Sequence, residues 1–312
     1  MPRNGLSPYV MFNHDEWAEL AKNAPLPLTQ GDLDRLSTLG DPIDLAEADA
    51  VSRPLSALMQ MYARATGQLY KETSGFFGRQ AERTPWIVGI AGSVAVGKST
   101  AARLLQQLLS RWPHTPHVDL VPTDGFLHPN EVLKERGIMG RKGFPESYDR
   151  RALIDFLHSV KSGEEENAVP VYDHISYNII PGEKIVIRKP DILIVEGLNV
   201  LQPPNPRSSS RLTVSDFFDF SIYMDADEDT LQEWYISRFQ SLRSTAFAHE
   251  HSYFRSYANL SDEEAEATAR QIWSSINLPN LRENIAPTRS RAKVILTKGK
   301  DHRIEEIALR KI

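Results

Sequence analysis

Cysteine is absent from the 312-residue sequence, which excludes disulfide bonds, thiolate metal ligands and cysteine nucleophiles. No apolar run approaches the roughly 18 residues that a membrane-spanning helix requires. The first twenty residues are polar, with Asp15, Glu16 and Glu19 among them, and lack the basic and apolar blocks of a signal peptide. We therefore expect a cytoplasmic protein with no membrane partner.

An excess of positive charge is also missing. Acidic residues outnumber basic residues by 41 to 36, which gives a formal net charge of -5. Proteins that bind nucleic acid usually carry a basic excess, so we expect no nucleic acid partner. Apolar residues make up 41% of the chain, which is enough to form a large core.

Strand and helix patterns alternate after residue 85. Short apolar runs predict strands at 86–91, 117–121, 191–195, 217–224 and 292–297. Leucines at helical spacing follow the first of these runs, and two further helices are expected between the last two. This alternation predicts an α/β fold with a mainly parallel sheet and helices on both faces.

The first 85 residues have a different character. Apolar residues at helical spacing, most clearly from Leu55 to Phe77, predict helices, and no chemical motif is evident. We interpret residues 1–85 as a helical N-terminal extension that packs on a core formed by residues 86–312.

A glycine-rich segment, GSVAVGKS, follows the first predicted strand and matches the P-loop pattern G-x-x-x-x-G-K-[ST]. Its glycines allow backbone N–H groups to turn toward phosphates, and the N-terminus of the next helix favours negative charge. Lys98 is expected to reach the β- and γ-phosphates of ATP, and Ser99 is expected to bind Mg²⁺. We assign nucleotide binding to Gly92, Ser93, Val94, Ala95, Val96, Gly97, Lys98, Ser99 and Thr100.

Acidic residues follow two other predicted strands. Glu196 ends the run DILIVE, which resembles a Walker B strand, so this carboxylate is expected to hold the metal ion or a metal-bound water. Asp124 follows the strand after the P-loop helix and should lie at the same edge of the sheet. A kinase that phosphorylates a hydroxyl needs a carboxylate to accept its proton, and Asp124 is the candidate base. The sequence leaves open which acid contributes more to holding Mg²⁺.

A P-loop is shared by GTPases, motor ATPases and kinases. The guanine-reading motif N-K-x-D and a D-x-x-G sensor are both absent, which disfavours a switch GTPase. A kinase also needs an acceptor pocket with cations and polar groups. Candidates are the basic loop at 141–146, the segment PVYDHISY at 170–177, and Tyr235 with Arg238, which share one face of a predicted helix.

These stretches resemble the bacterial type I pantothenate kinase family over nearly the whole chain. The most specific are AGSVAVGKST at 91–100, TDGFLHPN at 123–130, RKGFPESYD at 141–149, PDILIVEGLNVLQ at 190–202, and the run N-x-P-N-L-x-E-N-I-x-P-T-R at 277–289. The resemblance implies ATP- and Mg²⁺-dependent phosphorylation of pantothenate, the first step of coenzyme A biosynthesis. It also implies a homodimer in which a long N-terminal helix contributes to the interface.

The resemblance further implies roles for individual residues. Asp124 is expected to act as the base, and Lys98 and Arg238 are expected to neutralise the transferring phosphoryl group. Arg103 is expected to lie at the nucleotide and to take part in feedback inhibition by coenzyme A, and His302 to lie near the adenine. The expected substrate-binding residues are Lys142, Tyr172, His174, Tyr177, Tyr235 and Asn277.

Two other functions stay open at this point. One is a related kinase that acts on uridine or a sugar phosphate, as uridine kinase and phosphoribulokinase do. The other is a nucleotide-binding regulator without turnover. Ala101 and Pro122 stand where close relatives often have threonine, but neither change removes a group assigned to chemistry.

Overall fold

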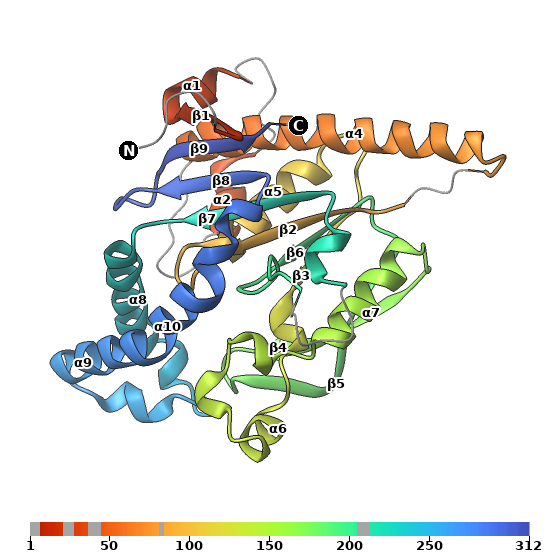
Figure 1. The fold of residues 1–312 in the computed structure, drawn as a ribbon. Coiled ribbons are helices and arrows are strands. Elements are labelled where there is room, and N and C mark those ends of the chain that lie inside the picture. Colours follow the sequence, from red (N-terminus) through yellow and green to blue (C-terminus); the bar gives the residue numbers. More distant parts are fainter. Residues whose placement is uncertain (1–6, 21–27, 37–44, 81–83, 205–211, 312) are drawn as a thin grey trace.

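A computed structural model describes residues 7–20, 28–36, 45–80, 84–204 and 212–311. Within these ranges, seven strands form a central sheet in the order β1-β9-β8-β7-β2-β6-β3 (Figure 1). Two further strands, β4 and β5, form a separate antiparallel pair on the opposite side of the molecule from helix α4. The fold is therefore an α/β layered structure with a small appended hairpin.

Five strands of the central sheet are mutually parallel. They are β2 (Trp86–Gly92), β3 (Val118–Pro122), β6 (Ile192–Glu196), β7 (Phe220–Asp225) and β8 (Val294–Lys298). Antiparallel strands β9 (Ile304–Arg310) and β1 (Tyr9–Asn13) extend the sheet beyond β8. The predicted mainly parallel sheet is confirmed.

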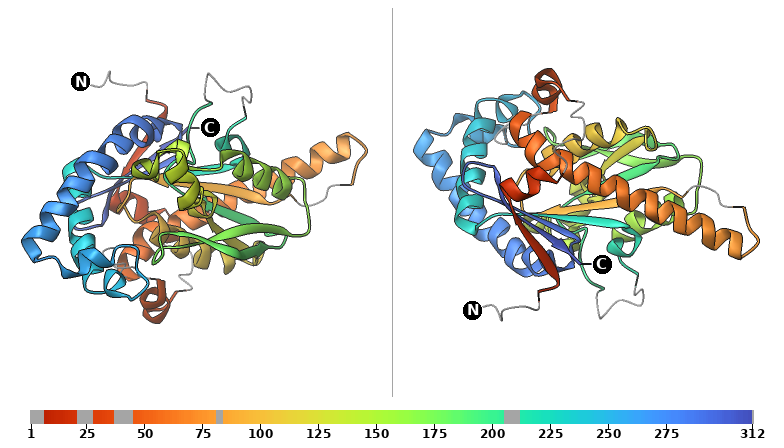
Figure 2. Two further views of the ribbon diagram at one scale, coloured as in Figure 1. Left: turned by 90° about the horizontal axis from the view of Figure 1, so that it is seen from below. Right: turned by 90° about the horizontal axis from the view of Figure 1, so that it is seen from above.

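Helices cover both faces of this sheet. Helix α4 (Arg53–Phe76) and helix α7 (Arg150–Lys161) lie on opposite sides of it, and α4 projects past the rest of the molecule (Figure 2). The remaining α-helices are α1 (His14–Glu19), α2 (Gln30–Leu36), α3 (Leu45–Glu47), α5 (Lys98–Ser110), α6 (Asn130–Glu135), α8 (Glu228–Arg243), α9 (Asp262–Ile272) and α10 (Leu278–Asn280). None of the described helices combines the length and apolar composition needed to cross a bilayer.

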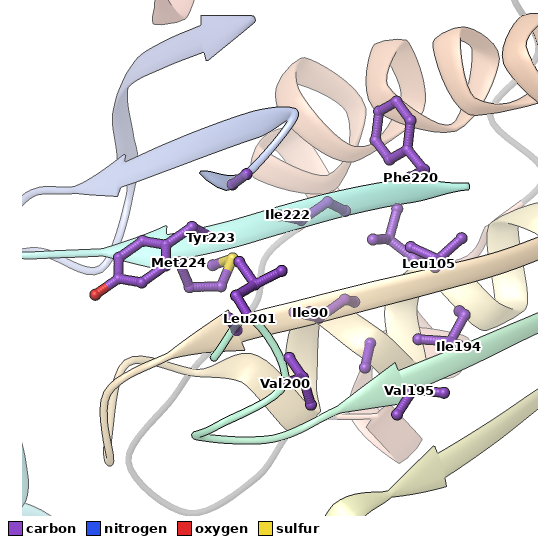
Figure 3. Close-up of a cluster of buried hydrophobic side chains, with 14 of the residues drawn as sticks. Ile90, Leu105, Ile194, Val195, Val200, Leu201, Phe220, Ile222, Tyr223 and Met224 are labelled. Atoms are coloured by element: carbon purple, nitrogen blue, oxygen red, sulfur yellow. The ribbon is translucent and has the colours of Figure 1, made fainter. Parts of the chain in front are cut away.

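The core lies between the central strands and the helices. Ile90, Ile194 and Ile222 come from three adjacent strands and are fully buried together with Leu105 of α5 (Figure 3). The strands read as continuous apolar runs because both faces of a parallel sheet are covered. Leu55 and Met59 of α4 join the same buried cluster, so the N-terminal region shares the core.

The register of the parallel strands positions the site. Ile90 of β2 and Pro122 of β3 both lie opposite Glu196, the last residue of β6. The carboxyl ends of β2, β3 and β6 therefore meet at one edge of the sheet. Ligands of open α/β sheets bind at this edge.

Some elements differ from the sequence predictions. The N-terminal region is not purely helical, because Tyr9–Asn13 forms strand β1 against β9, whose residues lie at the far end of the chain. The strand predicted at 217–224 begins at Phe220, since Val214–Phe217 forms a 3-10 turn. Strands β4 (Asn167–Asp173) and β5 (Asn178–Ile187) were not predicted. The domain boundary at residue 85 stays a prediction.

Candidate active site

The P-loop connects β2 to α5 and has the backbone geometry of a phosphate cradle. Gly97 precedes α5 with φ 92°, and Gly92 has φ 148°, so both adopt conformations that favour glycine. A Cβ at Gly92 would also lie 2.5 Å from the carbonyl oxygen of Met224. Lys98 Nζ donates to the carbonyl oxygen of Ser93 at 2.7 Å, so its ammonium group lies over the loop.

Ser99 and Glu196 form a pair of oxygen donors beside the loop. Ser99 Oγ donates to Glu196 Oε1 at 2.8 Å, and the Glu196 side chain is buried at the end of β6. Burial raises the pKa of Glu196, while the neighbouring charge of Lys98 opposes that shift. A hydroxyl and a carboxylate fit Mg²⁺, which is usually held by one or two carboxylates together with phosphates and water.

Asp124 lies in the 3-10 turn Thr123–Phe126 that directly follows β3. Burial lowers the pKa of Lys98, and the negative charges of Glu196 and Asp124 oppose this shift. Asp124 likewise raises the pKa of Glu196. The carboxylate of Asp124 is therefore on the same side of the sheet as Lys98, within electrostatic reach of both groups.

Lys142 provides a second, nearly buried cation. The residue is only 8% exposed. Its Nζ donates to Asn130 Oδ1 at 2.7 Å and to the carbonyl oxygen of Tyr177 at 2.5 Å. The same Nζ lies 3.9 Å from the centroid of the Tyr177 ring and 5.0 Å from that of Tyr172. Burial lowers the pKa of Lys142 to about 8, and the charge of Asp124 opposes the shift.

The β4–β5 hairpin contributes an aromatic wall to the site. The ring of Tyr172 contacts the rings of His174 and Tyr177 edge-on, with centroids 5.1 and 6.2 Å away. Phe254 continues the wall, because its ring centroid lies 4.7 Å from that of Tyr177. Burial raises the pKa values of Tyr172 and Tyr177, so both phenols stay neutral and can donate hydrogen bonds.

Helix α8 and the segment after α9 supply the opposite wall. Burial raises the pKa of Tyr235 to about 12, and the neighbouring Asn277 opposes the shift. Asn277 Nδ2 is buried and has no hydrogen-bond partner of good geometry among the described residues. Burial has the largest effect on the pKa of Lys98 and lowers it, while the charges of Glu196 and Asp124 oppose this shift. Arg238, one turn along α8, is close enough to Lys98 for its charge to lower this pKa further.

Arg103 and His302 both lie near the start of α5. Arg103 Nε donates to the carbonyl oxygen of Ser99 at 3.1 Å. The His302 ring stacks on Trp234 with a centroid distance of 4.1 Å, and it lines a cavity of about 60 Å³ with Gly97, Thr100 and Lys298. The cavity beside His302 therefore adjoins the P-loop, and none of the aromatic residues of the two walls lines it.

Several residues of the site were missed in the sequence. Tyr148 is buried, and its pKa is raised by burial first and by Asp124 next, so it lies close to the candidate base. Phe254 completes the aromatic wall, and Asn130 accepts from Lys142. Tyr148 lies in the motif at 141–149 and Asn130 in the motif at 123–130, so these motifs could have identified both residues. Phe254 follows no motif.

Comparison with known proteins identifies the family of the chain. Residues 87–252 match the phosphoribulokinase / uridine kinase family. A pantothenate kinase of Paenarthrobacter aurescens (strain TC1) is 53% identical over 311 residues, covering 99% of this chain and 96% of the relative. A pantothenate kinase of Parvibaculum lavamentivorans is 54% identical over 98% of this chain and 95% of the relative.

The chain belongs to the pantothenate kinase family. The resemblance found in the sequence is thereby confirmed over nearly the full length. Among solved structures, the YGR205w protein aligns with a TM-score of 0.52 and 14% identity, covering 80% of this chain and 99% of that protein. That similarity supports the fold of this pantothenate kinase family member and nothing finer.

We expect the rate of this pantothenate kinase family member to fall as pH rises through about 8, because Lys142 then loses its charge. Lys142→Arg should keep a cation at this position, so the alkaline fall in kcat/KM should disappear even if the maximum is lower. The measurement is kcat/KM from about pH 6 to about pH 10, which reports groups of the free enzyme.

Lys134→Arg on α6 is the matched control, since Lys134 is exposed. Its pH profile should match that of the unchanged protein. If the kcat/KM of Lys142→Arg still fell at alkaline pH with the same midpoint, Lys142 would be excluded as the titrating group.

Proposed function

We propose that the protein transfers the γ-phosphoryl group of ATP to the hydroxyl of pantothenate, giving 4'-phosphopantothenate in the first step of coenzyme A biosynthesis. The observation that carries this proposal is the meeting of Lys98 and Asp124 at one edge of the sheet, in a chain whose relatives are pantothenate kinases. Phosphoryl transfer to an alcohol requires a cation at the phosphates and a base at the acceptor.

In the proposed mechanism, the backbone N–H groups of the P-loop and Lys98 hold the β- and γ-phosphates. Asp124 orients the substrate hydroxyl and accepts its proton as the oxygen attacks phosphorus. Arg238 and Lys98 neutralise the charge that develops on the equatorial oxygens. Ser99 and Glu196 are the residues that would hold Mg²⁺, which supplies further charge neutralisation at the phosphates.

The acceptor pocket suits the rest of pantothenate. The amide and the carboxylate of this substrate need polar donors, which the phenols of Tyr172, Tyr177 and Tyr235 can provide. Asn277 Nδ2 is a further donor, since it has no partner among the described residues. His174 lies close enough to act electrostatically on Glu196, and its ring contacts that of Tyr172, which supports its assignment to the acceptor pocket. Lys142 supplies positive charge near Asp124.

The cavity lined by His302 and Lys298 is proposed to receive the adenine. It adjoins Gly97 and Thr100, so a base there can be joined to phosphates in the loop. We place the enzyme in the cytoplasm, where ATP and pantothenate are available.

Asp124→Asn should lower kcat by about a hundredfold to ten-thousandfold, because the proton acceptor is lost. Arg238→Ala should lower kcat by about a thousandfold or more through lost charge neutralisation. The affinity for ATP should stay within about threefold in Asp124→Asn, since the carboxylate faces the acceptor. A coupled assay of ADP release, with and without pantothenate, measures these effects.

Asp155→Asn on the exposed face of α7 is the control and should leave turnover unchanged. Near-normal turnover by Asp124→Asn would remove Asp124 as the base. Faster phosphorylation of uridine or a sugar phosphate than of pantothenate would reject the proposed substrate. ATP binding without any acceptor-dependent ADP release would indicate a regulator instead of an enzyme.

Feedback inhibition by coenzyme A is part of the proposal and depends on Arg103. This guanidinium lies beside the P-loop, within reach of a phosphate bound there. Arg103→Ala should raise the coenzyme A concentration for half-inhibition by about tenfold, the effect of losing one charged hydrogen bond, with a smaller change in the KM for ATP. An unchanged inhibition curve would exclude Arg103 from coenzyme A binding.

The enzyme is proposed to be a homodimer that buries the projecting end of α4. Leu69 and Phe76 are 65% and 86% exposed, and α4 borders a hollow of about 1450 Å³ that lies away from the candidate site. Exposed apolar surface of this kind is typical of protein interfaces. Leu69→Asp should give a monomer in sedimentation, whereas Gln68→Asp should not. A monomeric unchanged protein would exclude the dimer.

A further inference from the structure

Two asparagine side chains converge on one backbone oxygen next to Lys142. Asn199 Nδ2 donates to the carbonyl oxygen of Gly143 at 2.9 Å, and Asn280 Nδ2 donates to the same oxygen at 3.0 Å. Asn199 follows β6, and Asn280 ends α10. Residues from three separate motifs, at 141–149, 190–202 and 277–289, therefore meet at a single atom.

The loop that carries Gly143 is also closed by local bonds. Gly143 has φ 95°, and its N–H donates to Ser147 Oγ at 2.9 Å, which closes the loop locally. Lys142, the preceding residue, extends its side chain into the site. Fixing the Gly143 carbonyl from two directions therefore fixes the direction in which the Lys142 side chain leaves the backbone.

The orientation of Asn280 is itself determined by its neighbours. Asn284 Nδ2 donates to Asn280 Oδ1 at 3.0 Å, so the Asn280 amide must present its nitrogen to Gly143. Gln202 Nε2 in turn donates to the carbonyl oxygen of Asn284. Asn280 is only 4% exposed, so water does not compete with these bonds.

The other end of the Asn199 side chain is also buried. Asn199 Oδ1 and Thr123 Oγ1 are both buried and have no hydrogen-bond partner among the described residues. Both residues line one cavity of about 30 Å³, together with Tyr148 and Gln202. Thr123 Oγ1 packs against the Gly197 backbone, where an added Cβ would collide with it.

We propose that Asn199 and Asn280 are positioning residues that clamp the Gly143 carbonyl and so aim Lys142. The inference rests on the proposed function. If the two asparagines only stabilised the fold, replacing them would not change the kcat/KM for pantothenate more than the Kd for ATP.

The test compares Asn199→Leu and Asn280→Leu with Asn167→Leu as the matched control. Asn167 is also buried and donates its amide to a backbone carbonyl, of Glu164, at the far end of the β4–β5 hairpin. Each clamp variant should lower kcat/KM for pantothenate by about tenfold, the effect expected for one buried hydrogen bond, with the Kd for ATP within about twofold. The control should change neither quantity.

Amide hydrogen exchange of the peptide spanning 139–147 gives a readout that does not require turnover. Exchange should be faster in both clamp variants and unchanged in Asn167→Leu, because local opening follows the loss of the clamp. If the unchanged protein failed to phosphorylate pantothenate, the proposed function would fail, and exchange would still decide whether the clamp holds the loop. Unchanged exchange together with unchanged kcat/KM would overturn the inference.

Should a leucine variant not fold, Asn284→Ala, which only frees the Asn280 amide to rotate, provides the milder test by the same two measurements.

Discussion

The register of the parallel strands is the constraint on which the site depends. It brings the ends of β2, β3 and β6 together and so holds one cation, Lys98, near two carboxylates, Glu196 and Asp124. Separately, each of these charges would be costly to bury. Together, the positive and negative charges stabilise one another. The same arrangement provides a cation for phosphates and carboxylates for a metal ion and a hydroxyl.

Around this centre, the fold separates two tasks. In the proposed arrangement, Arg103 and the cavity beside His302 serve the nucleotide, and the β4–β5 hairpin and α8 serve the acceptor. Neutral phenols and an unpartnered amide line the acceptor side, which suits a substrate with an amide and a carboxylate. The membership of the chain in the pantothenate kinase family and the chemistry of this pocket point to the same substrate.

Sequence reasoning located the parts of the site that follow buried strands. The P-loop, Glu196 and Asp124 each come directly after an apolar run, so their common edge could be predicted from strand order alone. The aromatic wall and the clamp could not. Asn280 reaches Gly143 across 137 residues of sequence, and Phe254 contacts Tyr177 from an unrelated segment. Such contacts depend on how loops pack, which periodicity does not encode. Strand β1 was missed for a similar reason, since its partner β9 lies at the other end of the chain.

The central claim is that an alcohol is delivered by Asp124 to phosphates held by Lys98. A crystal structure with pantothenate, Mg²⁺ and a non-hydrolysable ATP analogue tests it most directly. We predict that the primary hydroxyl oxygen of pantothenate lies about 2.6–3.2 Å from the Asp124 carboxylate and in line with the terminal phosphate above Lys98. A bound pantothenate whose hydroxyl contacts another residue, with Asp124 turned away from the phosphate, would contradict it.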